Sequence, residues 1–251
     1  MSLDERALRT AILALGVVPS TLLGSAELPP EIALLPPWAT VFSSMFLHGG
    51  FMHLAGNMLY LWIFGDNIEH ALGWKRFILF YAVCGVAAAL TQALIDPASN
   101  IPMIGASGAI SGVLGGYLLL YPQAKVRVLF FPFGIFGVPA MIVLGGWFVM
   151  QLLSGFGSSG GGGVAFWAHV GGFVAGMALI PFMKQADIPL FAKARHNAFY
   201  REPARHPEWR PEREPMQGPR ARRQGPWGQH TDVAPKPKKK RDKGRIDPWN
   251  T

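Results

Sequence analysis

Charged residues are scarce in this 251-residue chain. Asp, Glu, Lys and Arg make up 15% of it and half of the residues are hydrophobic, whereas a soluble domain usually carries about a quarter charged residues. The composition therefore argues against an ordinary soluble protein.

Cysteine is nearly absent as well. The single Cys84 excludes a disulfide within the chain, and cysteine usage does not indicate a redox compartment.

The few charges are unevenly distributed along the chain. The stretch from Lys184 to the end holds 17 of the 23 basic residues and 8 of the 15 acidic ones. It has a net charge of +9, and the preceding residues have a net charge of −1. The sequence thus divides into an apolar body and a basic tail.

Long apolar runs dominate the body. They lie at about 54–65, 77–95, 104–121, 133–153 and 164–183. Roughly 20 apolar residues cross a bilayer as a helix, and a backbone in lipid must satisfy its own hydrogen bonds. The first run reaches this length when the apolar residues around it, 48–67, are included. We therefore predict an all-α, polytopic membrane helix bundle with five clear spans.

The two ends of the chain do not fit this pattern. The apolar stretch at residues 7–18 is short and contains Arg9, so we expect segment 1–27 to hold an incomplete first span or an interfacial helix. Residues 28–183 form the predicted membrane domain. The tail, 184–251, is rich in Pro, Arg, Lys and Gly, which favours disorder. Its KPKKKRDK motif could bind nucleic acid, but contact with anionic lipid is the favoured interpretation.

The basic residues predict an orientation in the membrane. Alternate connections carry Lys75 and Arg76, Lys125 and Arg127, and Lys184, whereas 96–103 and 154–163 contain no Lys or Arg. Because basic loops face the cytoplasm, the tail is expected inside and the uncharged loops outside. The pattern is that expected of a multi-pass protein of a bacterial inner membrane.

Polar side chains within the apolar body are candidate functional groups, because they are costly in lipid. They are His48, His53, Asn57, Ser107 and His169. His53 and Asn57 are four residues apart and share a helix face. The predicted topology places all five toward the outer side of the membrane.

The serine and the last histidine share their helix faces with small residues. Ser107 is on a face with Ser111 and Gly115, next to a stripe of Gly108, Gly112 and Gly116; His169 is on a face with Gly172 and Gly176. Small faces let membrane helices approach closely, as a Ser–His hydrogen bond of about 2.6–3.2 Å requires. The pattern predicts that Ser107 and His169 are paired.

Each of these residues also has a structural explanation. Ser107 alone could be a packing residue, His169 a buried histidine bonded to a carbonyl, and His53 with Asn57 a link between helices. A zinc site is disfavoured because the histidines lack HExxH spacing and a nearby carboxylate, and a transporter because the sequence has no internal repeat. Their joint occurrence at one depth favours a catalytic site without metal or cofactor.

Three motifs carry a resemblance to a known family. They are H-x₄-H-x₃-N (His48, His53, Asn57), G-A-S-G (105–108) and A-H-x₂-G-x₃-G (168–176). With them, residues 28–183 resemble the rhomboid intramembrane serine proteases. The resemblance implies Ser107 as nucleophile and His169 as general base. It also implies an oxyanion hole of His53, Asn57 and the Ser107 N–H, with His48, Gly105 and Gly108 in support.

The resemblance further implies the activity and its partners. We expect hydrolysis of single-span membrane proteins near their outer end, within a lipid bilayer, and we do not expect a nucleic-acid partner. The alternative is an inactive rhomboid-like protein that binds membrane segments for trafficking or quality control. Ser111 stands where relatives sometimes carry an aromatic that stacks on the base, and no acidic residue lies within the spans. Packing and backbone are therefore expected to orient His169.

Overall fold

The computed structural model describes residues 3–157 and 164–192. Its helices are α1 (Leu3–Leu15), α2 (Pro19–Leu22), α3 (Pro37–Ser43), η1 (Ser44–Phe46), α4 (Phe51–Tyr60), the π-helical turn η2 (Leu61–Gly65), α5 (Asp66–Leu72), α6 (Trp74–Ile95), α7 (Ser107–Leu120), α8 (Ala140–Gly157) and α9 (Phe166–Met183). Two strands, β1 (Lys125–Phe130) and β2 (Gly134–Pro139), form an antiparallel hairpin. The predicted disorder of the tail concerns residues that lie almost entirely outside this description.

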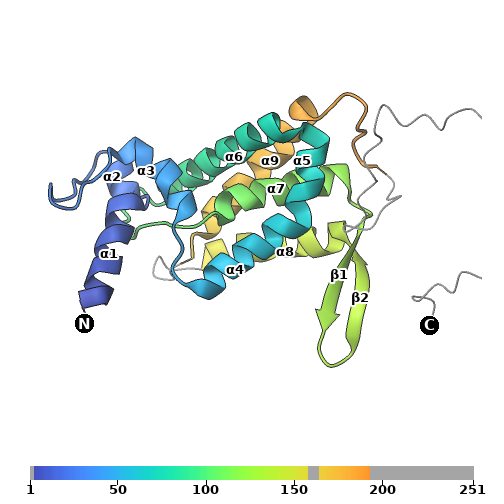
Figure 1. The fold of residues 1–251 in the computed structure, drawn as a ribbon, viewed down its shortest axis with the longest axis horizontal. Coiled ribbons are helices and arrows are strands. Elements are labelled where there is room, and N and C mark those ends of the chain that lie inside the picture. Colours follow the sequence, from blue (N-terminus) through green and yellow to red (C-terminus); the bar gives the residue numbers. More distant parts are fainter. Residues whose placement is uncertain (1–2, 158–163, 193–251) are drawn as a thin grey trace, which may run out of the picture. The chain divides into compact units, whose positions relative to one another are not determined.

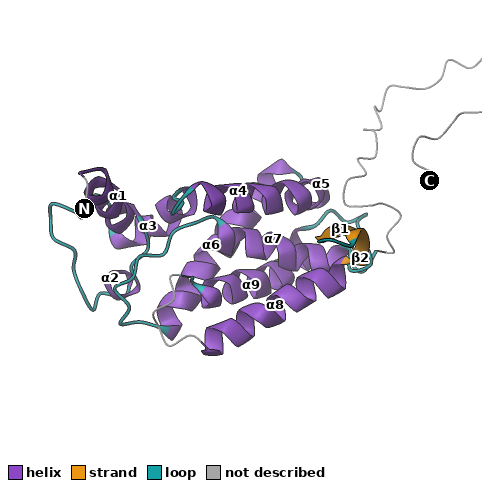
Figure 2. Cartoon of the chain, turned by 90° about the horizontal axis from the view of Figure 1, so that it is seen from below, coloured by secondary structure: helices purple, strands orange, loops and turns teal. Residues whose placement is uncertain are grey.

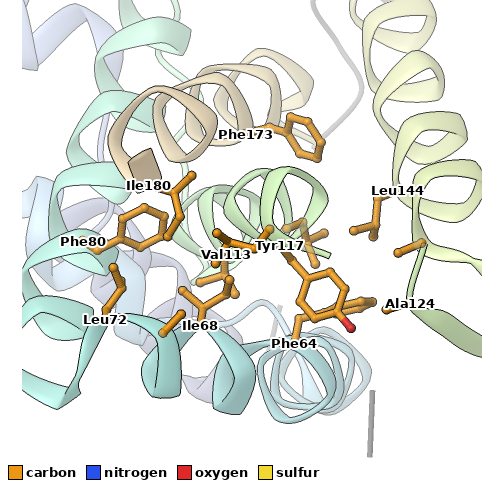
Figure 3. Close-up of a cluster of buried hydrophobic side chains, with 14 of the residues drawn as sticks. Phe64, Ile68, Leu72, Phe80, Val113, Tyr117, Ala124, Leu144, Phe173 and Ile180 are labelled. Atoms are coloured by element: carbon orange, nitrogen blue, oxygen red, sulfur yellow. The ribbon is translucent and has the colours of Figure 1, made fainter. Parts of the chain in front are cut away.

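Helix α7 forms the centre of the bundle. Ten of its 14 residues are buried, and it packs against α6, α8 and α9, with η2 and α5 on a further side (Figure 1, Figure 2). Figure 3 shows its Val113 and Tyr117 enclosed by side chains of the surrounding elements. Protein thus surrounds most of α7, and its small residues are explained by contact with neighbouring helices on several sides.

The core around α7 is aromatic and aliphatic. It includes Phe64 of η2, Ile68 of α5, Phe80 of α6, Leu144 of α8, and Phe173 and Ile180 of α9. The Tyr117 ring meets the Phe64 ring edge-on, with the centroids 5.0 Å apart. Each neighbouring element contributes at least one bulky side chain, so the helices are held by interdigitated packing as well as by lipid.

The helices only partly match the predicted spans. Three helices in the described part of the chain, α6, α8 and α9, are long and apolar enough to cross a membrane. Helix α7 is shorter, and α4, η2 and α5 follow one another over 51–72 with acidic residues in the last segment. An integral membrane protein is therefore supported, and the count of five spans stays a prediction.

The prediction of an all-α fold is wrong at one place. The apolar run 133–153 does not form one helix, because 134–139 pairs with 125–130 as a β-hairpin and α8 begins only at Ala140. Gly134 has a φ of +109°, which favours glycine, and Pro132 and Pro139 disfavour a helix interior. The β-branched and aromatic residues between them suit a strand.

The N-terminal segment packs against the loop that precedes α7. Val17 and Met103 form a two-way backbone bridge, with N···O distances of 3.0 and 2.7 Å. The Ser20 hydroxyl donates to Asn100 at 2.8 Å, and the Ser20 N–H donates to the Ser99 carbonyl at 3.1 Å. Residues 17–20 therefore hold the loop that leads to Ser107.

Candidate active site

Ser107 is the first residue of α7, at the end of a constrained loop. The preceding Gly105 has a φ of +120°, which an L side chain rarely adopts, and its N–H donates to the Ser44 carbonyl at 2.8 Å. The first N–H groups of a helix have no partner within it and carry the positive end of its dipole. Negative charge that develops beside Ser107 would therefore be stabilised.

Helices α7 and α9 meet backbone to backbone. A methyl group added at Gly172 would overlap the Gly108 carbonyl, and one at Gly176 would overlap the Gly112 carbonyl. Helix α6 reaches the same place, because a methyl group at Gly108 would overlap the Cβ of Ala88 in α6. Gly108 is thus a packing residue at the junction of three helices.

This close approach brings together the two residues that the sequence pairs. The Ser107 hydroxyl oxygen lies 2.8 Å from Nε2 of His169. On the other side of the ring, Nδ1 lies 2.8 Å from Oε1 of Gln151 in α8. Since an amide oxygen can only accept, this contact requires a proton on Nδ1. Nε2 is then unprotonated and accepts the hydrogen bond from Ser107.

A second residue of α8 also contacts the histidine. The Trp147 ring lies over His169 with a centroid separation of 5.9 Å and a tilt of 36°. Trp147 and Gln151 are one helical turn apart and therefore share a face. The expectation that packing and backbone alone orient His169 is thus wrong, because a side-chain amide also bonds its ring.

Sequence reasoning missed Gln151, although a signal was present. It is the only side chain with an amide, carboxyl, hydroxyl or charged group in the apolar run 133–153. A polar group at such a position is costly unless it is bonded, and Gln151 is buried.

A second missed residue is Gln92 of α6, whose Oε1 accepts from the Ala168 N–H at 3.3 Å. The Ala168 N–H also donates to the Ala165 carbonyl at 3.1 Å, so Gln92 is a second acceptor for this group and links α6 to the start of α9.

The His53 ring also lies close to Ser107. The Gly49 N–H donates to Nδ1 of His53 at 3.3 Å, so Nε2 of His53 carries the proton and is a donor. A Cβ atom built on Gly105 would lie 2.9 Å from this Nε2 and 3.7 Å from the Ser107 hydroxyl oxygen. Only glycine leaves room there for the ring.

Asn57 and His48 complete the polar group on this side. Asn57 is buried, and among the described residues nothing accepts a hydrogen bond from its Nδ2. Such an unpaired buried donor is expensive in a folded protein, and a bound substrate oxygen is one group that could satisfy it. The His48 ring meets the His53 ring edge-on at 5.2 Å, so His48 braces His53.

A cavity opens onto Ser107, His169 and His53. Its volume is about 780 Å³, within the range of roughly 300–1,000 Å³ that is typical of ligand sites. Ser107, His169, His53, Gln92 and Trp167 are among the residues that line it. A peptide segment could therefore reach the serine.

No three of the His, Cys, Asp and Glu side chains in the described residues are placed to hold a metal ion.

The comparison with known proteins agrees with this architecture. A family model described as the rhomboid domain matches residues 36–186, more than half of the chain. The chain belongs to the rhomboid family.

Several curated rhomboids are similar to it. The chain is 33% identical over 147 residues to Rhomboid protein 1, mitochondrial, of Saccharomyces cerevisiae, a match that covers 55% of this chain and 40% of the yeast protein. It is 32% identical over 139 residues to Rhomboid protease GluP of Bacillus subtilis, covering 55% of this chain and 25% of that protein. The matched stretches span less than half the length of either relative.

Proposed function

We propose that this rhomboid is a serine endopeptidase that hydrolyses peptide bonds of membrane-embedded substrates. The observation that carries the proposal is the hydrogen-bonded chain from Ser107 through His169 to Gln151, with distances of 2.8 Å on each side of the ring. A serine hydroxyl becomes a useful nucleophile only when a neighbouring base removes its proton. The arrangement supplies that base in the required tautomer.

The proposed reaction proceeds through an acyl-enzyme. Ser107 attacks the scissile carbonyl carbon while its proton passes to Nε2 of His169. The resulting imidazolium donates from Nδ1 to Gln151 and then gives the Nε2 proton to the leaving amine. Water, activated by the same histidine, hydrolyses the ester and restores Ser107. Gln151 takes the place of the carboxylate of a Ser–His–Asp triad as the group that orients the ring.

The oxyanion of the tetrahedral intermediate needs donors arranged in advance. The proposed donors are the Ser107 N–H at the start of α7, Nε2 of His53 and Nδ2 of Asn57. The Gly49 contact leaves Nε2 as the ring nitrogen of His53 that can donate, and the Asn57 donor has no other partner among the described residues. These two observations support their assignment to the oxyanion.

The proposed substrates are single-span membrane proteins cleaved near the outer face, since the basic connections predict that the Ser107 end of α7 faces that side. The tail would then lie in the cytoplasm, as expected for a bacterial inner-membrane protein. The competing function is an inactive rhomboid that only binds membrane segments.

Fluorophosphonate labelling of the purified protein separates these two functions. A folded, wild-type protein that reacts at Ser107 has an activated nucleophile and supports the protease. A folded protein that fails to react, and fails to cleave a reconstituted substrate, favours the binding protein.

Replacing Gln151 by alanine should lower kcat by about ten-fold to a hundred-fold, the equivalent of about 1.4–2.7 kcal/mol in the barrier, because the histidine loses a hydrogen bond that fixes its tautomer. The Gln151→Glu variant should recover activity with the acid limb of its pH–rate profile moved to higher pH, since a carboxylate stabilises the imidazolium.

Gln185→Ala is the matched control. Gln185 follows the C-terminal end of α9, far along the helix from His169, and its amide donates to the His70 carbonyl. Equal rates for wild type and Gln151→Ala at every pH would remove Gln151 from the proposed mechanism.

Replacing Asn57 or His53 by alanine should lower kcat by about 10²–10³, the usual cost of one oxyanion donor, and leave KM nearly unchanged. Steady-state cleavage of a reconstituted substrate measures both constants. Met58→Ala, beside Asn57 but partly exposed, serves as the control for α4. A change confined to KM would assign these residues to substrate binding.

A further inference from the structure

The β1–β2 hairpin has an apolar outer half. Between Val128 and Ala140 the chain has no charged, amide or hydroxyl side chain. Several large side chains there are strongly exposed; they include Leu129, Phe130, Phe131, Phe133, Ile135 and Phe136. Phe131 is the extreme case with 88% of its surface exposed. Water alone is an unfavourable environment for such a cluster.

The strand register places apolar groups on both faces of the outer half. Val128 pairs with Phe136 on one face, and Leu129 pairs with Ile135 on the other, because successive side chains alternate between the faces. A ribbon that docks on a protein partner buries one face and keeps a polar one for solvent. This ribbon has no such polar face near its tip.

The base of the hairpin fixes its direction. Ala124 and Val126 are buried in the core around α7, and the Ala140 N–H donates to the Ala124 carbonyl at 2.8 Å. Figure 1 shows the ribbon projecting sideways from the bundle, across the direction of α6, α7 and α9. If those helices cross a bilayer, the hairpin runs along its surface.

Basic side chains mark the same end of the bundle. Lys125 and Arg127 are exposed on β1 and, by the alternation, lie on one face of the ribbon. Arg76 at the start of α6 donates to the Met183 carbonyl at the end of α9, at 3.2 Å. Cations beside an apolar ribbon, at one end of the bundle, are complementary to anionic headgroups above acyl chains.

We propose that the hairpin is an interfacial membrane anchor, which lies in the leaflet at the end of the bundle where α7 and α9 terminate. Its Phe side chains enter the boundary between headgroups and acyl chains, and Lys125 and Arg127 contact lipid phosphates. The open edges of a two-stranded ribbon still need hydrogen-bond partners, which hydrocarbon cannot supply. This requirement limits the depth to the interface. The proposal is independent of proteolytic activity.

Depth-dependent fluorescence tests the anchor in the full chain. A single cysteine is placed at Phe131, with Cys84 replaced by alanine, and is labelled with an environment-sensitive dye in phosphatidylcholine vesicles. Gln123→Cys, exposed just before the hairpin, is the matched control, and Phe133→Cys repeats the measurement at a second tip position. We expect emission at 131 and 133 to shift to shorter wavelength than at 123. Quenching there should be stronger by lipids spin-labelled near the headgroup than by lipids labelled at the chain end.

The lipid composition tests the role of the basic residues. Added phosphatidylglycerol should increase the quenching at 131, and the Lys125→Glu/Arg127→Glu variant should lose this increase. Quenching at 131 by aqueous iodide, with none by spin-labelled lipid, would overturn the proposal. The proposal would also be overturned if protection of the dye from iodide depended on the protein-to-lipid ratio. That result would identify a second copy of the chain as the partner of the hairpin.

Discussion

Replacing Ser107 by alanine should abolish cleavage of a reconstituted membrane substrate and all labelling by a fluorophosphonate. The hydroxyl that lies 2.8 Å from His169 is the proposed nucleophile, and the proposed acyl-enzyme forms on it. In a soluble serine protease the loss of the nucleophile costs on the order of 10⁶ in kcat. His169→Ala should be equally inactive, because residues that act as one unit are not additive.

The matched control is on the same helix. Ser111 is buried one turn after Ser107, and its hydroxyl donates to the Ser107 carbonyl at 2.6 Å. Ser111→Ala removes a neighbouring, more deeply buried hydroxyl that does not contact the histidine, and should cleave at nearly the wild-type rate. Turnover by folded Ser107→Ala above the uncatalysed background would require a different nucleophile.

Replacing Gly172 by alanine should both inactivate and destabilise the protein. Its methyl group would overlap the Gly108 carbonyl, so α9 must move away from α7 within one turn of His169. Overpacking of a tight core typically costs about 1–3 kcal/mol. A displacement of about 1 Å in a reactive geometry can cost 10²-fold in rate. Thermal unfolding in detergent and the cleavage rate measure the two effects separately.

Gly146→Ala in α8 provides the comparison. A methyl group built on Gly146 meets no atom within 4 Å, so this variant should be as stable and as active as wild type. Should Gly172→Ala match Gly146→Ala in both measurements, the close contact of α7 with α9 would not be what holds the serine and histidine together.

Sequence reasoning could pair Ser107 with His169 because the small residues beside them repeat every four positions. That spacing identifies the face of a helix on which two backbones can meet, which is why Gly172 and Gly176 are informative. The same reasoning could not place Gln151. When every side of a helix is apolar, periodicity does not indicate which side faces a neighbouring helix. Only the packing of α8 against α9 shows that the side with Gln151 faces His169.

The β-hairpin was hidden for a related reason. In an apolar sequence both strands and helices consist of hydrophobic residues, so length and hydropathy do not distinguish a strand from a helix. The residues that do separate them are Pro132, Gly134 and Pro139, which a membrane helix tolerates when it is surrounded by partners. Composition alone therefore extends a helix through 133–139 where the chain instead turns back on itself.

The bridge between Val17 and Met103 lies partly outside the stretch that identifies the family. The rhomboid match begins at residue 36, yet residues 17–20 supply bonds to the loop that ends at Gly105. A fragment that begins at residue 36 would keep every motif residue. It would lose the hydrogen bonds from residues 17–20 that hold the loop before Ser107. Changes at residues 17–20 can thus shift the loop before Ser107 in proteins that carry identical motifs, and a comparison restricted to the matched domain does not include these residues.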